Sequence, residues 1–229
     1  MLIHGMFSNL SVYYFRIAPV LAARFRVVLY DLKSHGLSER VEEGYGLDSM
    51  SDDLLGLADV LGLASFHLGG YSFGGLIALN SAIRFPERIR KLVVIEAPDP
   101  ADEKARGIID EYSREFLENY VQNYAGTTHL TMGRRQLERN HRMYEYLFYQ
   151  TSIRRDMQRE NDFFTRPALR GLNGRILLIY GDQSNCLDAG RYLQACLPGS
   201  ELVSLAGDHN LPVQEPERLA GEMLTFLTT

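Results

Sequence analysis

The residues with the clearest chemical signature are 70–74 (GYSFG), which form a G-x-S-x-G pattern. The pattern lies between a strand-like run at 66–69 and a helix-like stretch at 74–84. A serine on so sharp a turn must adopt a strained backbone, and the flanking glycines remove Cβ atoms that would clash with neighbouring segments. The helix N-terminus also favours negative charge near Ser72. In this strand–turn–helix context the pattern predicts that Ser72 is a nucleophile.

A serine hydroxyl is a poor nucleophile at neutral pH and needs a general base. Of the six histidines, His209 is the best candidate, because it directly follows the last strand-like run at 201–205. In a parallel sheet, the loop after that strand emerges at the same carboxyl edge as the serine turn. No pair of histidines has HExxH or similar spacing, and Cys186 and Cys196 are interpreted as free thiols. We therefore expect no metal and no organic cofactor.

Strand-like and helix-like stretches alternate along most of the chain. The expected strands are 26–30, 66–69, 91–95, 175–180 and 201–205, together with the end of a strand at 2–3. The expected helices outside the 101–170 region are 11–24, 49–62, 74–84 and 216–227. Residues 101–170 contain no strand-like run and predict helices at 102–124, 133–150 and 151–160. This alternation predicts an α/β fold with a mostly parallel, doubly wound sheet. The core would comprise 1–99 and 171–229, with an all-helical cap inserted at 100–170.

In these features the chain resembles the α/β-hydrolase superfamily over essentially its whole length. The matching segments are HGM at 4–6, DLKSHGLS at 31–38, the serine turn, Gly181-Asp182 and GDH at 207–209. The resemblance implies an oxyanion hole built from the backbone N–H groups of Met6 and Phe73, and a cap above the active site. Cores of this family normally begin with a β-hairpin before the HGx strand, so we expect the N-terminal strands to be missing.

The acid that should orient His209 is where the sequence departs from the family pattern. The usual position, three residues after Gly181, is occupied by Ser184, which cannot stabilise an imidazolium as a carboxylate does. Our first candidate is Glu96, directly after the 91–95 run, because some relatives carry their acid after that strand. An unpaired carboxylate there would also be costly. Asp182 and then Asp188 are the alternatives.

The predicted cap is rich in aromatic residues and arginine. Aromatic residues recur at helical spacing over 112–124, and we expect Tyr144 and Phe148, with His4 and Tyr71 of the core, to contact substrate. Residues 134–170 contain nine arginines and five acidic residues. One interpretation is a cap that receives an anionic substrate, such as a CoA-linked or carrier-linked thioester. The interpretation we favour is a solvated helix face with intrahelical ion pairs.

The composition excludes several functional classes. The 229 residues carry a net charge of -5, which argues against a nucleic-acid partner. No apolar run approaches the roughly 18 residues that a membrane span requires. No basic region precedes an apolar core at the N-terminus, so we expect no signal peptide and a cytoplasmic location. The oligomeric state is not indicated.

Together these features predict a serine hydrolase that cleaves a small carboxylic ester or thioester through an acyl-enzyme. Two alternatives stay open because of the departure at Ser184. The same residues could carry out lyase, acyl-transfer or cyclisation chemistry, or the chain could be a ligand receptor on a degenerate hydrolase fold.

Overall fold

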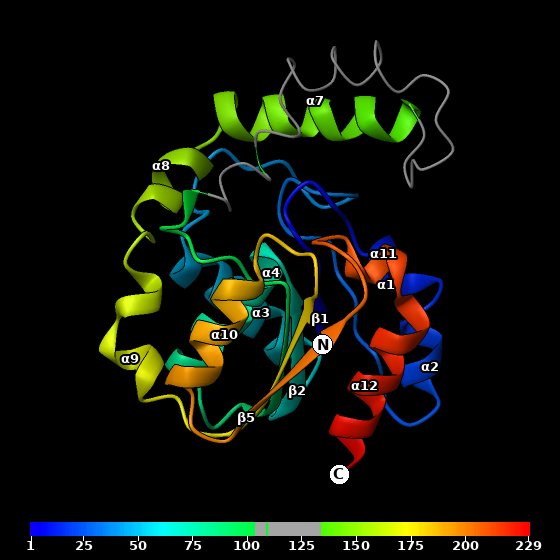
Figure 1. Ribbon diagram of the computed structural model, residues 1–229. Coiled ribbons are helices and arrows are strands. Elements are labelled where there is room, and N and C mark those ends of the chain that lie inside the picture. Colours follow the sequence, from blue (N-terminus) through cyan, green and yellow to red (C-terminus); the bar gives the residue numbers. More distant parts are fainter. Residues whose placement is uncertain (104–108, 110–133) are drawn as a thin grey trace.

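A five-stranded parallel sheet forms the centre of the computed structural model, which describes residues 1–103, 109 and 134–229 (Figure 1). The strands lie in the order β1-β2-β3-β4-β5, and each pairs in parallel with the next. Their bounds are β1 (Leu2–Ile3), β2 (Phe66–Tyr71), β3 (Ile89–Ile95), β4 (Arg175–Gly181) and β5 (Ser200–Leu205). The sheet confirms the predicted α/β class. It also brings the carboxyl ends of β2, β3, β4 and β5 to one edge.

Helices cover both faces of this sheet. Helices α3 (Leu47–Val60), α4 (Phe73–Arg84) and α10 (Leu187–Cys196) pack on one face. Helices α1 (Ser11–Tyr14), α2 (Ala18–Ala22), α11 (Leu211–Gln214) and α12 (Pro216–Thr228) lie on the other, as Figure 1 shows. Two separate apolar cores result, one on each face. None of the described helices combines the length and hydropathy that crossing a membrane requires.

Two predicted elements near the N-terminus differ from the structure. The buried strand expected at 26–30 is wrong: the segment is at least partly exposed, and Leu29 makes only an isolated parallel bridge to Leu2. Its neighbour β1 is only two residues long and offers little to pair with. The helix expected at 11–24 is divided into α1 and α2. Pro19 has no N–H to donate, and it lies in the first turn of α2, where none is needed.

The segment between β3 and β4 carries helices α7 (Arg134–Gln150), α8 (Ile153–Gln158) and α9 (Pro167–Arg170), with a short 3-10 turn at Phe163–Thr165. Helix α7 lies beyond the carboxyl edge of the sheet (Figure 1). Most of the predicted helix at 102–124, with its aromatic positions, falls outside the described residues.

Two buried carboxylates hold this segment on the core. Asp156 Oδ2 accepts a hydrogen bond from the Tyr45 N–H at 3.0 Å, and Glu160 Oε1 accepts one from the Leu47 N–H at 3.0 Å. Leu47 is the first residue of α3, so Glu160 satisfies a donor that the helix itself leaves free. The start of α3 is therefore capped by a side chain more than 100 residues away in sequence.

Candidate active site

Ser72 lies on the turn between β2 and α4, with φ 55° and ψ −120°. A Cβ on Gly70 would overlap the backbone oxygen of Gly74, and a Cβ on Gly74 would overlap that of Ile3. Both glycines are therefore required by close backbone packing, as the sequence indicates. The Ser72 N–H donates to the Ile95 carbonyl oxygen at 2.8 Å, which ties the strained turn to the end of β3.

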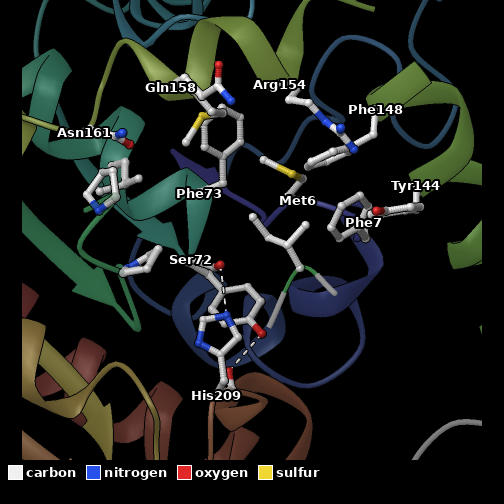
Figure 2. Close-up of a pocket in the computed structure, with 16 residues that line it drawn as sticks. Met6, Phe7, Ser72, Phe73, Tyr144, Phe148, Arg154, Gln158, Asn161 and His209 are labelled. Atoms are coloured by element: carbon white, nitrogen blue, oxygen red, sulfur yellow. Dashed lines mark hydrogen bonds between the residues drawn. The ribbon is translucent and has the colours of Figure 1, made fainter. Parts of the chain in front are cut away.

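His209 approaches Ser72 from the loop between β5 and α11. Its Nε2 atom lies 3.0 Å from Ser72 Oγ, as Figure 2 shows. The Tyr71 hydroxyl donates to the His209 carbonyl oxygen at 2.9 Å and so holds this loop against the serine turn. The geometry places an imidazole nitrogen where it can exchange a proton with the serine hydroxyl.

Glu96 completes a chain of contacts to Ser72. It directly follows β3, is fully buried, and has a φ of 53°, which is uncommon for a residue with a side chain. Its Oε2 atom lies 3.2 Å from His209 Nδ1. The Ser184 hydroxyl donates to the same oxygen, and the Gly181 N–H donates to Oε1. Both carboxylate oxygens therefore have hydrogen-bond donors, as burial of a carboxyl group requires.

The two alternative acids lie elsewhere. Asp182 Oδ1 accepts a hydrogen bond from the Gly207 N–H at 3.1 Å and so orders the loop before His209. Asp188 is exposed and forms an ion pair with Arg191 at 3.0 Å. In the structure, Glu96 is the one carboxylate of the three that contacts His209.

Cys186 also contacts His209, which the sequence did not indicate. Its Sγ atom lies 3.5 Å from Nδ1, and the side chain is almost wholly buried. Burial, and then the nearby Glu96 carboxylate, raise the pKa of this thiol well above its ordinary value. Glu96, Cys186 and His209 offer ligand atoms within 4.8 Å of one another. Because Glu96 and His209 are engaged with Ser184 and Ser72, we assign no metal to this cluster.

His4 is predicted to contact substrate, but it lies in the core and does not line the cavity beside Ser72. Its Nε2 atom accepts a hydrogen bond from the Leu32 N–H at 3.0 Å, and Nδ1 lies 2.7 Å from the Gly5 carbonyl oxygen. This pattern fits a neutral ring that donates from Nδ1. Burial, followed by the neighbouring His35, lowers the pKa of His4 to about 3. Its observed role is to brace the turn that carries Met6.

A cavity of about 690 Å³ opens above Ser72 and His209 (Figure 2). Met6 and Phe73 line it beside Ser72, and Phe73 is the first residue of α4, where backbone N–H groups lack partners within the helix. The other predicted contacts Tyr71, Tyr144 and Phe148 also line it. Residues that the sequence did not single out include Phe7, Arg154, Gln158 and Asn161. The size is that of a small-molecule site.

The profile of a family described as "alpha/beta hydrolase fold" matches residues 1–216. The chain belongs to the alpha/beta hydrolase family. Among curated proteins it is similar to a 2-hydroxymuconate semialdehyde hydrolase of Pseudomonas sp. (strain CF600), with 39% identity over 98 residues. That match spans 42% of this chain and 35% of the relative. The chain covers well under two thirds of the first curated relatives' own lengths.

Solved structures support the same fold. A hydrolase from Pseudomonas aeruginosa PA01 superposes with a TM-score of 0.75 at 24% identity, covering 100% of this chain and 89% of that one. An enol-lactonase from Burkholderia xenovorans LB400 gives 0.70 at 20% identity, covering 100% and 90%. At these identities the likeness shows the fold alone. An alpha/beta hydrolase architecture is consistent with the layout of the serine turn, the cap segment and the His209 loop.

Proposed function

We propose that this alpha/beta hydrolase is a serine hydrolase that cleaves a small carboxylic ester or thioester. The observation that carries the proposal is the continuous line of contacts from Glu96 through His209 to Ser72 at the base of a largely apolar cavity. A nucleophile, a base and an orienting acid in this order are the parts that acyl transfer requires.

In the proposed mechanism, Ser72 Oγ attacks the substrate carbonyl carbon while His209 Nε2 takes the hydroxyl proton. Glu96 accepts the Nδ1–H of His209, fixes the tautomer, and stabilises the imidazolium. The backbone N–H groups of Met6 and Phe73 donate to the oxyanion. One such donor is worth about 3–4 kcal/mol in the transition state.

His209 then gives its proton to the departing alcohol or thiol, which leaves an acyl group on Ser72. A water molecule, deprotonated by His209, attacks this acyl-enzyme and releases the carboxylic acid. The cavity lining supports an apolar acyl group, because the Met6, Phe73 and Leu76 side chains surround the space next to the serine.

The test is turnover of 4-nitrophenyl butyrate by the wild type and by Ser72→Ala. Loss of the nucleophile should reduce kcat by a factor on the order of 10⁴ or more. Ser65→Ala is a matched control, because Ser65 precedes β2 at the opposite edge of the sheet and contacts Arg90. It should retain full activity.

Two outcomes would overturn the proposal. Tight ester binding without turnover would favour a receptor. Release of products other than the acid and the alcohol would favour lyase or acyl-transfer chemistry.

A further inference from the structure

The cavity above Ser72 has an unusual charge balance. Among the described residues that line it, Arg154 is the one with a permanent charge, and none is an aspartate or glutamate. Among the described lining residues between β3 and β4, the neutral polar side chains include Tyr144, Gln158 and Asn161. Within the described part of the chain, the side chains that border the space beside the nucleophile therefore present a net positive charge.

At least three of the other described arginines between β3 and β4 pair with acids. Arg155 contacts Glu43 at 2.6 Å, Arg159 lies 3.8 Å from Asp156, and Arg166 lies 3.0 Å from Glu160. Of these pairs, Arg159 with Asp156 has the i,i+3 spacing of the intrahelical pairs that the sequence predicted, whereas Arg155 with Glu43 and Arg166 with Glu160 are not intrahelical.

Arg154 is different. Within the part of the chain that the structure describes, its guanidinium forms neither an ion pair nor a hydrogen bond and instead lies over the rings of Phe148 and Tyr149, each at 5.4 Å. The residue is exposed overall, yet its side chain borders the cavity, and Figure 2 shows it beside Phe148. It is thus held at the edge of the cavity by ring contacts rather than by a carboxylate.

This packing leaves the hydrogen-bonding capacity of Arg154 unused. A guanidinium stacks on aromatic rings through its flat face, while its N–H donors point outward in its own plane. Two parallel N–H groups match the two oxygens of a carboxylate. Among the described lining residues, Arg154 is the one permanently charged group. This described wall suits a singly charged group better than a phosphate dianion, for which it offers no second permanent cation.

We propose that the substrate carries a carboxylate in addition to its scissile ester, and that Arg154 binds this carboxylate and determines specificity. This inference rests on the proposed hydrolase function. Tyr144 and Phe148, whose rings stack at 4.8 Å, would form the apolar wall between the carboxylate and the reacting carbonyl.

Matched substrates test the proposal. One pair carries the charge on the acyl side (4-nitrophenyl hemiadipate against 4-nitrophenyl hexanoate), and the other on the leaving group (3-(hexanoyloxy)benzoate against phenyl hexanoate). In at least one pair the charged ester should have a kcat/KM about 10- to 100-fold higher, mainly through KM. Arg154→Gln should remove this preference, because it should lower kcat/KM for the charged esters about 10- to 100-fold more than for the neutral esters. Arg154→Lys should restore part of the preference.

Arg155→Gln is the matched control, because Arg155 is adjacent in sequence but pairs with Glu43. It should keep the preference. Absence of a preference in both pairs, or a preference that survives in Arg154→Gln, would overturn the proposal. Hexanoyl-CoA carries phosphates that hexanoyl-N-acetylcysteamine lacks. If the wild type prefers hexanoyl-CoA and Arg154→Gln does not, Arg154 binds a phosphate, and the proposal of a substrate carboxylate is overturned.

A binding measurement separates this proposal from the proposed hydrolase function. If no ester is hydrolysed, the hydrolase function fails, and calorimetry on Ser72→Ala with monomethyl adipate still tests Arg154. Binding should then weaken about 10- to 100-fold in Ser72→Ala/Arg154→Gln. Equal binding by the two variants would overturn the assignment of Arg154.

Discussion

The Ser184 hydroxyl donates a hydrogen bond to Oε2 of Glu96, the same oxygen that lies 3.2 Å from His209 Nδ1. Ser184 stands at the position where the family usually carries its acid. Here that position supplies a hydroxyl that supports a carboxylate arriving from the end of β3. In the proposed mechanism the acid therefore comes from the end of β3 instead of the loop after β4, and it lies beside the histidine there.

Replacement of Glu96 by glutamine tests whether the carboxylate charge, and not only the size of the side chain, is needed for activity. Glutamine is nearly the same size but cannot stabilise an imidazolium, so we expect kcat/KM for 4-nitrophenyl butyrate to fall by about 10²- to 10⁴-fold. Asp182→Asn is the control, since the asparagine oxygen can still accept from the Gly207 N–H. Near-normal activity in Glu96→Gln, or an equal loss in Asp182→Asn, would contradict the assignment.

Returning the acid to the usual family position should rescue that defect. In the double variant Glu96→Gln/Ser184→Asp, the new carboxylate would start from a residue whose side chain already reaches the oxygen beside His209. We expect activity at least about 10-fold above that of Glu96→Gln alone. Ser184→Asp alone should lower activity, because two carboxylates would then share one buried site. A double variant no more active than Glu96→Gln would contradict the inference that a carboxylate at residue 184 can take the place of Glu96 beside His209.

The two cysteines should differ in reactivity. Burial raises the pKa of Cys186, so little thiolate forms at neutral pH, and its side chain is almost inaccessible. Cys196 is partly exposed. Titration with 5,5′-dithiobis(2-nitrobenzoate) should therefore detect one fast thiol in the native protein and two in urea. Rapid reaction of Cys186, identified by peptide mapping, would show that the contact with His209 is open to solvent.

His4 should make the folded state sensitive to acid. Its pKa falls from 6.5 to about 3 on folding, because the buried ring is held neutral. Below pH 6.5 the unfolded chain therefore binds a proton that the folded chain does not. As the pH falls below 6.5, His4 should therefore lower the free energy of unfolding by about 1.4 kcal/mol for each pH unit. His35 is shifted in the same direction by burial and adds to the slope.

Urea unfolding at pH 7 and pH 5 checks this prediction. His4→Gln should be less stable at pH 7, because the brace on the Met6 turn changes, but it should lose less stability on acidification than the wild type. The same pH dependence in both proteins would show that His4 is not the group responsible.

The sequence predicted the catalytic candidates better than it predicted their surroundings. Ser72, Glu96 and His209 each follow a strand, and parallel strands present their carboxyl ends at one edge, so their convergence follows from topology. The strand prediction at 26–30 is wrong because the neighbouring β1 is only two residues long, so the segment makes just an isolated bridge there, although its apolar side chains pack against the cores. Apolar composition does not reveal how long a neighbouring strand is.

Arg154 and Cys186 could not be singled out for a different reason. Arg154 and Arg155 are adjacent and identical in type, so the sequence does not distinguish them. Only their placement on α8 decides that Arg154 borders the cavity and that Arg155 pairs with Glu43. Cys186 reaches His209 because the loop after β4 is joined to the loop after β5, where the Gln183 N–H donates to the Gly207 carbonyl oxygen at 2.9 Å. Such contacts depend on tertiary packing and leave no local signal in the sequence.

The most direct test of the central claim is covalent labelling with a fluorophosphonate, read by intact mass and peptide mapping. The reagent reacts with a serine only where a base and an oxyanion hole activate it. The account predicts one adduct per chain on the peptide that contains Ser72, no adduct in Ser72→Ala, and slower labelling in Glu96→Gln. An unlabelled wild type, or an adduct on another residue, would contradict it.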